Sequence, residues 1–331
     1  MSTLSEVAQK LVADNKGILA ADESTGTIEK RFAKINLEST EENRRIYREL
    51  LFTTPKVEEF ISGVIMFDET IRQHAGDGRS FVQVLNDKGI IPGIKVDKGK
   101  IPLAGFPDEE VTEGLDGLRD RLNEYRDLGA QFAKWRGVFK IGQGLPTKGA
   151  VHANAHALAR YAALAQEAEL VPIVEPEVLM DGDHSIEECG IVTGMVLDEV
   201  FAELFINKVD MNGMLLKPNM VLAGEEAENK STADDIASAT LEVFKKSVPA
   251  EVPGIVFLSG GQSSIEATKN LCELNRDKKS EHPWALSFSF GRALQNEALE
   301  AWHGSGDNWQ KAQEVFYNMA KADAEARRGV C

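Results

Sequence analysis

Short runs of apolar residues recur along the chain, and longer amphipathic stretches separate them. The runs are rich in Val, Ile, Leu and Phe without strict alternation of apolar and polar residues, a pattern typical of strands that are covered on both faces. They occupy residues 17–22, 61–67, 90–96, 132–141, 170–179, 214–221, 252–258 and 284–290. Their spacing, roughly thirty to forty-five residues, leaves room for one helix after each run. The pattern therefore predicts strands and helices in alternation.

The stretches between the runs carry the signals of helices. Ser39, Ser185 and Ser263 are each followed three residues later by Glu, which matches the capping box at a helix start. Amphipathic or helically spaced apolar residues lie in 5–15, 112–128, 150–169, 188–205 and 233–244. We therefore expect a helix over each of these stretches.

Repeated strand-helix units imply a parallel sheet. About eight such units favour a closed (β/α)8 TIM barrel over an open, doubly wound sheet. No stretch rich in Gly, Pro or Ser and no low-complexity segment divides the chain. The expected architecture is an α/β fold with a single barrel domain over residues 1–331.

Composition and charge narrow the class of protein. The chain has 331 residues, of which 43% are hydrophobic, and its formal net charge is -16. This charge argues against sequence-independent binding to nucleic acid or to an anionic membrane. No apolar run approaches the roughly 18 residues of a membrane span, and Met1, Ser2 and Thr3 open into acidic, helix-like sequence rather than a signal segment. We therefore expect a cytoplasmic protein.

The cysteines do not indicate a cross-linked or metal-bound framework. Cys189, Cys272 and Cys331 form an odd set without a CxxC pair. Neither a disulfide framework nor a zinc-thiolate site is expected from this spacing. The predicted state is three reduced thiols.

Charged and hydroxyl residues lie within the predicted strands or directly after them. In a parallel barrel the carboxyl ends of the strands meet at one mouth, while the interior is normally filled by branched apolar side chains. The polar residues in question are Asp22, Lys95, Lys134, Arg136, Glu175, Glu177, Lys217, Ser259, Ser289 and Arg292. We therefore expect them to converge on one site.

Lys217 is the most unusual of these residues because it lies inside the apolar run 214–221. A desolvated amine tends to be neutral, and a neutral amine can form a Schiff base with a carbonyl substrate. A neighbouring ammonium from Lys134 would lower the pKa of this amine, and a desolvated carboxylate such as Glu175 with a raised pKa could carry protons. The alternative is a buried network of ion pairs that only stabilises the barrel.

The side-chain period of two in a strand places Lys134 with Arg136, and Glu175 with Glu177, on common faces. Further along, Ser259 and Gly260 end the seventh run, and Gly291 and Arg292 end the eighth. Glycine-rich turns at helix starts, together with an arginine, bind phosphate well, and this is the frequent phosphate site of such barrels. Lys30, Arg31 and Lys95 offer a second basic group, so the pattern suits a substrate that is phosphorylated at both ends.

Two other motifs carry less weight. The sequence after Gly142-Gln143-Gly144 lacks the third glycine of a dinucleotide-binding fingerprint. His152 and His156 have the spacing of metal ligands on a helix, but the glutamate of an HEXXH motif is missing and no further Cys or His lies nearby in the sequence. We therefore expect neither a dinucleotide nor a metal.

Seven segments in order resemble the class I fructose-bisphosphate aldolases, the family that works through a Schiff base without metal. The segments are GILAADESTGTIEKR, PGIKVDKG, AKWRGVFKIG, VPIVEPEVL, LLKPNMV, FLSGGQS and SFGRALQ. The resemblance implies a Schiff-base role for Lys217, general acid/base catalysis by Glu175, and assistance to carbon-carbon cleavage by Asp22. It implies supporting roles for Lys134, Glu177 and Arg136.

The resemblance also implies ligands for both ends of the substrate, with no cofactor. Ser259, Gly260, Gly291 and Arg292 match the pocket for the phosphate on the ketone half, and Ser24, Lys30, Arg31 and Lys95 match the other end. The expected reaction is the reversible cleavage of fructose 1,6-bisphosphate to dihydroxyacetone phosphate and glyceraldehyde 3-phosphate, in glycolysis and gluconeogenesis, by a homotetramer.

Three alternatives to this activity stay open at the level of sequence. They are a metal-dependent barrel aldolase, a phosphosugar isomerase, and a barrel kept as a binding or scaffold protein. The sequence departs from the family in having Thr27 where serine is frequent, and in ending at Cys331 without the tyrosine-terminated tail of animal members. Because that tail is associated with proton transfer on the enamine, the resemblance leaves this step and the choice between bisphosphate and monophosphate sugars open.

Overall fold

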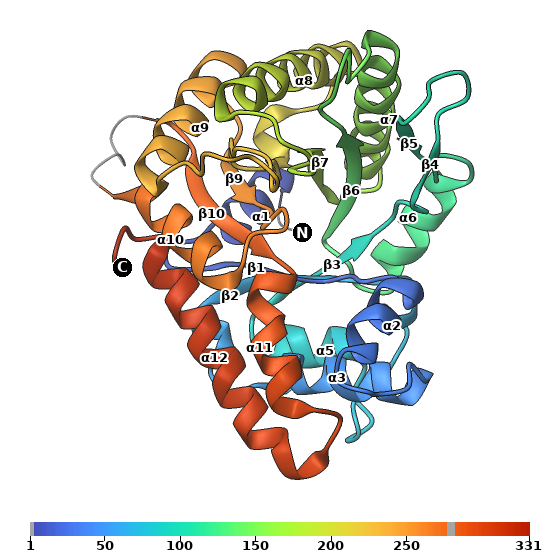
Figure 1. Ribbon diagram of the computed structural model, residues 1–331. Helices are drawn as coiled ribbons and strands as arrows, with labels where there is room; N and C mark the ends of the chain where they lie inside the picture. Colours follow the sequence, from blue (N-terminus) through green and yellow to red (C-terminus); the bar gives the residue numbers. More distant parts are fainter. Residues whose placement is uncertain (1–2, 277–281) are drawn as a thin grey trace.

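Eight parallel strands close into a barrel, and helices surround it (Figure 1). The computed structural model describes residues 3–276 and 282–331. Around the barrel the order is β1-β10-β9-β8-β7-β6-β3-β2. The barrel strands are β1 (Gly17–Ala21), β2 (Ile61–Met66), β3 (Ile91–Lys95), β6 (Phe132–Phe139), β7 (Val171–Val178), β8 (Leu215–Leu216), β9 (Gly254–Phe257) and β10 (Ala285–Phe290). The predicted (β/α)8 barrel is confirmed, with each barrel strand inside its predicted run.

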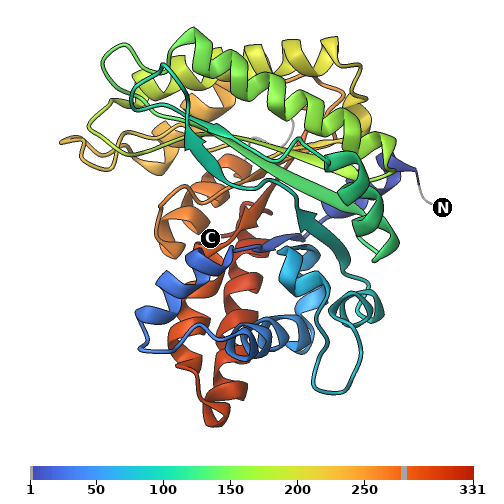
Figure 2. The same cartoon turned by 90° about the vertical axis from the view of Figure 1, so that its right-hand side faces the viewer.

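Helices surround the barrel, as the turned view also shows (Figure 2), whereas α1 precedes β1 and packs against the barrel interior. They are α1 (Leu4–Leu11), α2 (Thr25–Ala33), α3 (Glu41–Thr53), α4 (Asp68–Ile71), α5 (Phe81–Asp87), α6 (Leu118–Asp127), α7 (Lys148–Glu167), α8 (Ile186–Ile206), α9 (Ala233–Ser247), α10 (Ser264–Asn275), α11 (Arg292–Trp302) and α12 (Trp309–Ala326). Short 3-10 turns cover Val57–Glu59, Met211–Gly213 and Gly306–Asn308. In the described ranges, none of these helices is long and apolar enough to cross a membrane.

The barrel interior is packed by side chains from several strands and from α1. Leu11 of α1 belongs to the same buried cluster as Phe132, Val171 and Leu215. A Cβ atom on Gly93 of β3 would lie 2.2 Å from the Phe132 ring, so only glycine leaves room for this aromatic side chain. The interior below the mouth is therefore a packed core rather than a channel.

Two of the three predicted capping boxes are confirmed. The hydroxyls of Ser185 and Ser263 accept hydrogen bonds from the N–H groups three residues later, at the starts of α8 and α10. The prediction for Ser39 is wrong by one residue, because Thr40 caps α3 and accepts from the N–H of Asn43 at 3.1 Å. Both Ser39 and Thr40 precede a glutamate-rich turn, so the sequence pattern does not distinguish them.

The helix predicted over 112–128 is only partly confirmed. Residues Glu110–Thr112 form β5, which pairs antiparallel with β4 (Lys100–Pro102) in a hairpin outside the barrel (Figure 1). The helix α6 starts only at Leu118, because Gly114 (φ +126°) and Gly117 (φ +66°) hold positive-φ conformations that interrupt a helix. Thr112 instead donates a hydrogen bond from its hydroxyl to the carbonyl oxygen of Arg136 (2.7 Å), which fastens the hairpin beside β6.

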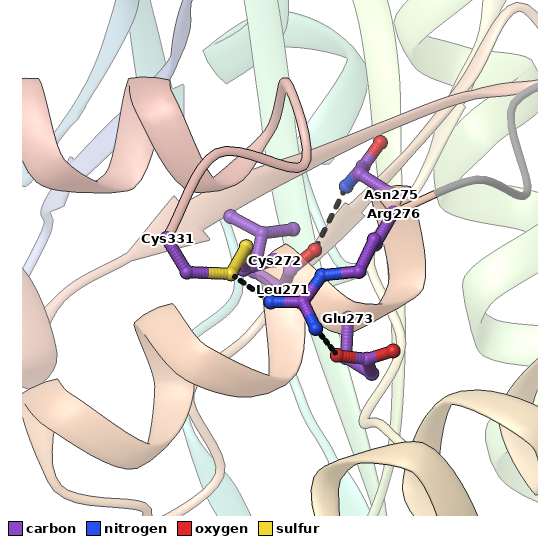
Figure 3. Close-up of a disulfide and its surroundings, with 6 residues drawn as sticks. All are labelled: Leu271, Cys272, Glu273, Asn275, Arg276 and Cys331. Carbon is purple, nitrogen blue, oxygen red and sulfur yellow. Dashed lines mark hydrogen bonds and ion pairs between the residues drawn. A yellow bond between two sulfur atoms is a disulfide. The ribbon is translucent and has the colours of Figure 1, made fainter.

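The prediction of three reduced thiols is wrong. Cys272 of α10 and Cys331 are joined by a disulfide across 59 residues (Figure 3). Cys189 is a buried free thiol. After α12 the chain returns to the end of α10, which brings the two Cα atoms to 6.0 Å, and Arg276 donates a hydrogen bond to the sulfur of Cys331. Sequence spacing could not reveal this pair because the fold creates the proximity.

Met1 and Ser2, on which the expected absence of a signal segment partly rests, lie outside the described residues.

Asp323 of α12 is a fully buried acid at the packing of α10, α11 and α12. The Thr268 hydroxyl donates a hydrogen bond to its Oδ1 atom (2.6 Å), but its Oδ2 atom has no hydrogen-bond partner. Burial raises the pKa of Asp323 to about 8; the hydrogen bond from Thr268 acts against this rise, and the negative charge of Glu297 adds to it. The folded protein therefore keeps a proton here at pH values where an unfolded chain has released it.

This buried acid should make stability depend on pH. Its contribution is fully present below about pH 4 and is lost as pH rises toward about 8, because unfolding then releases the proton. Between pH 5 and pH 8, the free energy of unfolding of the wild type should fall by about 1.4 kcal/mol per pH unit, compared with that of Asp323→Asn. Urea denaturation at each pH measures both free energies. Glu314→Gln, at an exposed acid on the same helix, should keep the wild-type slope. Equal slopes in all three proteins would contradict the assignment.

Candidate active site

A cavity of about 440 Å³ opens at the carboxyl ends of the barrel strands. Most of the residues singled out in the sequence line it, from the strands β3, β6 and β7, from the turns after β1, β8, β9 and β10, and from the helices α2 and α11. They are Asp22, Ser24, Arg31, Lys95, Lys134, Arg136, Glu175, Glu177, Lys217, Ser259, Gly260, Gly291 and Arg292. The structure thus brings together all the predicted site residues except Lys30.

Lys217 follows β8 directly and is held in the barrel wall. Its N–H donates a hydrogen bond to the carbonyl oxygen of Val174 in β7 (2.8 Å), so the parallel pairing continues past Leu216. Pro218, which has no N–H to donate, comes next, and its carbonyl oxygen still accepts a hydrogen bond from the N–H of Leu258 after β9 (3.1 Å). The side chain is 4% exposed, and its Nζ atom lies 3.2 Å from Glu175 Oε1. The amine therefore points into the cavity beside a carboxylate, on a rigid element.

Lys134 of β6 bridges the two acids of the site. Its Nζ atom lies 2.6 Å from Asp22 Oδ2 and 3.0 Å from Glu175 Oε2. Burial alone would lower the pKa of the Lys134 ammonium, but the two carboxylates raise it above the usual range. Burial would likewise raise the pKa of Asp22, but the positive charges of Lys134 and Lys217 hold it well below the usual range. Lys134 is therefore a fixed positive charge and Asp22 a fixed negative one.

The expectation of a raised pKa for Glu175 is wrong for the protein without substrate. Burial does act to raise this pKa, but the positive charges of Lys134, Lys217 and Arg136 together outweigh burial and lower it. The sequence predicts desolvation of Glu175, which raises its pKa. It does not reveal the cations that the fold places on either side of this residue. In the free protein Glu175 is therefore a carboxylate, ready to accept a proton.

Arg136 and Glu177 form a second charge pair beside the first. The Nε–H of Arg136 on β6 donates to Glu177 Oε2 on β7. Burial opposes the charge of Arg136, but the carboxylates of Glu177 and Glu175 raise its pKa. Both members line the cavity, as do Lys134 and Glu175, so the predicted common faces of the two strand pairs are confirmed.

One end of the cavity has the features of an anion site. Gly260 has φ +56°, which a residue with a side chain rarely adopts, and the turn exposes backbone beside the buried Ser259. Gly291 precedes α11, whose first residue is Arg292. In addition, the buried hydroxyl of Ser289 lines the cavity without a hydrogen-bond partner. Backbone amides at a helix start and an arginine are the donors that a phosphate requires.

Arg31 and Lys95 supply positive charge on the other side. Arg31 of α2 pairs with the buried Glu23, which also binds Arg48 at 2.5 Å. The Nζ atom of Lys95 lies 3.4 Å from Asp97 Oδ1. Ser24, at the start of α2, shares a hydrogen bond of 3.0 Å with the hydroxyl of Thr27. These groups form a second polar end of the same cavity.

Lys30 does not contribute to this cavity. Its side chain is exposed on α2, and it is absent from the cavity lining although Arg31 is present. Adjacent residues of a helix point about 100° apart, so Lys30 and Arg31 leave α2 in different directions. The structure therefore does not place Lys30 at the cavity, and its part in substrate binding stays a prediction.

Several residues that line the cavity are not among those predicted from the sequence. Glu23 fixes Arg31, Asp97 accompanies Lys95, and Lys100 and Thr112 reach the cavity from the β4-β5 hairpin. Asp97 lies two residues after Lys95, so the side-chain period of a strand could have indicated it. No signal in the sequence places the hairpin over the mouth.

Comparisons with known proteins agree with this geometry. A family model for class-I fructose-bisphosphate aldolase matches residues 3–330. A probable fructose-bisphosphate aldolase class 1 of Xanthomonas campestris is 54% identical over 327 residues, covering 98% of this chain and 97% of that protein. Cytosolic fructose-bisphosphate aldolase 4 of Arabidopsis thaliana is 53% identical over 314 residues, covering 95% of this chain and 80% of that protein.

A solved structure is similar throughout. The fructose-bisphosphate aldolase of Plasmodium falciparum, crystallised with TRAP and a small-molecule inhibitor, has a TM-score of 0.96 and 51% sequence identity. The similarity covers 98% of this chain and 94% of that one. With a matching barrel, a buried lysine at its mouth and relatives at about half identity over nearly the whole length, the chain belongs to the class-I fructose-bisphosphate aldolase family.

Proposed function

We propose that Lys217 is the nucleophile of a reversible aldol cleavage, in which fructose 1,6-bisphosphate gives dihydroxyacetone phosphate and glyceraldehyde 3-phosphate. The cleavage itself is the activity of the family to which the chain belongs. The observation that carries the role of Lys217 is its buried amine, 3.2 Å from a carboxylate that is itself paired with a second lysine. The reaction belongs to glycolysis and, in the reverse direction, to gluconeogenesis.

Formation of the Schiff base uses Lys217 and Glu175. Glu175 Oε1 is within reach to accept a proton from the lysine, and the free amine then attacks the ketone carbon. Glu175 returns a proton to the resulting hydroxyl, which leaves as water and gives a protonated imine. The lowered pKa of Glu175 suits the first of these transfers, because the residue begins as the carboxylate.

Cleavage uses the protonated imine as the electron acceptor. A carboxylate, Asp22 or Glu175, takes the proton of the hydroxyl on C4, the C3–C4 bond breaks, and its electron pair forms an enamine while the aldehyde leaves. Protonation of the enamine at C3 and addition of water then release the ketone and free Lys217. Lys134 holds both carboxylates in place throughout, because it bridges them at 2.6 and 3.0 Å.

The two polar ends of the cavity suit the two phosphates of the substrate. Ser259, Gly260, Gly291 and Arg292 bind the phosphate on the ketone half, while Ser24, Arg31 and Lys95 bind the other end. The Arg136–Glu177 pair lines the same cavity and orients the sugar hydroxyls. Since the overall charge is -16, these local cations are what makes the mouth attractive to a bisphosphate.

Borohydride trapping tests the nucleophile and the independence from metal together. Incubation with fructose 1,6-bisphosphate, borohydride and a chelator is expected to give one covalent adduct per chain, on Lys217, because borohydride reduces a protonated imine to a stable amine. Peptide mass spectrometry locates the adduct. Full turnover under chelation without any adduct would indicate a mechanism without a Schiff base, such as that of a phosphosugar isomerase. Loss of turnover on chelation would indicate a metal-dependent aldolase.

Arg292 should control affinity for the phosphate. Loss of a charge-assisted hydrogen bond costs roughly 1.5–3 kcal/mol, so Arg292→Ala is expected to raise KM about 10- to 100-fold. Arg292→Lys should recover only part of the affinity, because an ammonium lacks the two-pronged geometry of the guanidinium. Arg160→Ala, at an exposed arginine on α7, is the control and should leave KM unchanged. If Arg292→Ala keeps the wild-type KM, Arg292 does not bind the phosphate.

We further propose that the single barrel domain over residues 1–331 assembles into a cytoplasmic homotetramer. Exposed apolar side chains on α8 support assembly: Ile191, Phe205 and Ile206 are 72%, 80% and 69% exposed. The Arabidopsis relatives named cytosolic support the location. Sedimentation at about four times the chain mass of 36.3 kDa would support the tetramer, and sedimentation as a monomer would refute it.

A further inference from the structure

Outside the catalytic cavity, two histidines of α7 face two glutamates of α8. The two helices lie side by side on the outer layer in both views (Figures 1 and 2). His152 and His156 are four residues apart on α7, and Glu199 and Glu203 are four residues apart on α8. Residues at this spacing lie on one face of a helix, so the two pairs meet across the helix contact.

The polar atoms of this group lie close together. His152 Nδ1 is 2.9 Å from Glu199 Oε1 and 3.4 Å from Glu203 Oε1. The other oxygen of Glu203, Oε2, is 3.0 Å from His156 Nδ1. The ligand atoms of His152, Glu199 and Glu203 all lie within 4.8 Å of one another. One imidazole nitrogen and two carboxylate oxygens therefore already surround a common point.

The burial of Glu203 distinguishes this group from an ordinary cluster of surface charges. Its side chain is only 8% exposed, whereas those of Glu199 and His152 are 39% and 62% exposed. Asn207 also donates a hydrogen bond to Glu203 Oε2, at 3.3 Å. A carboxylate held inside the helix contact is thus oriented from behind by Asn207 and His156, while its Oε1 atom faces the two exposed partners.

The chemistry of the group suits a divalent transition-metal ion. Imidazole nitrogen and carboxylate oxygen bind Zn²⁺ at about 2.0–2.2 Å, which in a tetrahedral site separates neighbouring ligand atoms by about 3.4 Å. The two separations from His152 Nδ1, 2.9 and 3.4 Å, are close to this value, and the ligand oxygens of Glu199 and Glu203 lie within 4.8 Å of each other. A hydrogen bond to the second oxygen of a ligating carboxylate, here from His156, is the usual support of such a ligand.

The structure assigns a metal site to this face: His152, Glu199 and Glu203 bind one divalent transition-metal ion of the Zn²⁺ class, and His156 is a positioning residue for Glu203. The expectation from sequence was no metal here, because the residues between the two histidines do not match HEXXH. The missing ligands come instead from the next helix. None of the four residues lines the catalytic cavity, so the ion clamps α7 to α8 and takes no part in the aldol reaction.

Zn²⁺ titration of the full-length protein after chelator treatment tests this site. Calorimetry is expected to show one Zn²⁺ per chain for the wild type, and the midpoint of thermal unfolding should rise with Zn²⁺ because the ion binds the folded state. His152→Ala should abolish both effects, and Glu199→Gln should do so at a half-exposed position that does not endanger folding. His156→Ala should weaken binding about 10- to 100-fold, as expected for a residue that orients a ligand.

A matched control and two outcomes decide the question. His74→Ala removes another exposed histidine and should bind Zn²⁺ as the wild type does. Absence of Zn²⁺ binding to the wild type would overturn the proposal and leave an ordinary set of ion pairs. Equal binding by the wild type and His152→Ala would also overturn it, because the ion would then lie elsewhere in the protein.

Discussion

Replacement of Lys217 by methionine is expected to lower kcat by roughly five orders of magnitude or more, as removal of a nucleophile does in covalent catalysis. Methionine has a similar length and suits the apolar run around it, where the lysine is only 3% exposed, so the variant should fold. Steady-state assay of fructose 1,6-bisphosphate cleavage measures the loss. The borohydride adduct should disappear at the same time.

Lys217→Arg separates nucleophilicity from charge. It keeps a positive charge beside Glu175, but a guanidinium does not form a Schiff base. Both variants should therefore be equally inactive. If either retains turnover within tenfold of the wild type, Lys217 is not the nucleophile and the buried charges serve only the stability of the barrel.

Replacement of Glu175 by glutamine should lower kcat by about 10²- to 10⁴-fold, the usual contribution of a general acid/base. In the wild type, burial acts to raise the pKa of Glu175. The positive charges of Lys134, Lys217 and Arg136 outweigh burial, so the pKa lies below its ordinary value. The carboxylate form therefore persists above that lowered pKa. The acid limb of kcat/KM, measured against pH, should accordingly lie below the ordinary range of a glutamate.

Comparison with Asp22→Asn assigns the separate steps. Glu175→Gln should slow adduct formation, measured as the rate of borohydride trapping, because Glu175 Oε1 is the carboxylate oxygen 3.2 Å from Lys217. If Asp22 takes the proton of the C4 hydroxyl, the rate of borohydride trapping in Asp22→Asn should remain faster than the rate of cleavage. Wild-type rates of both trapping and cleavage in Glu175→Gln would exclude Glu175 from the chemistry.

The barrel and its charged mouth could be predicted because both rest on local signals. A strand covered on both faces must be apolar, so Lys217 within 214–221 and the pair Glu175 and Glu177 within 170–179 were conspicuous exceptions. The repeated spacing then indicated one barrel, and a barrel brings the ends of its strands together. The positions of the lysines and carboxylates follow from that topology.

Features that depend on distant parts of the chain could not be predicted from local patterns. The pKa of Glu175 is set by cations from β6 and from the end of β8, and the disulfide depends on the return of the chain end to α10. The sequence pattern places Thr112 in a helix. In the structure Thr112 pairs with Lys100 in a hairpin, and this partner cannot be recognised from the sequence around Thr112. The carboxylates that face His152 come from another helix, beyond the reach of any motif on α7.

The pairing of β1 with β10 means that the active site cannot be complete before β10 has been synthesised. Gly17–Ala21 pairs on one side with β2 soon after it is made, but its other neighbour, Ala285–Phe290, follows about 270 residues later. At ribosomal rates of about 5–20 residues per second, that edge waits roughly half a minute for its partner. Asp22 after β1 and Arg292 after β10 therefore come together only once β10 has been made, and until then one edge of β1 is unpaired and open to pairing with another strand.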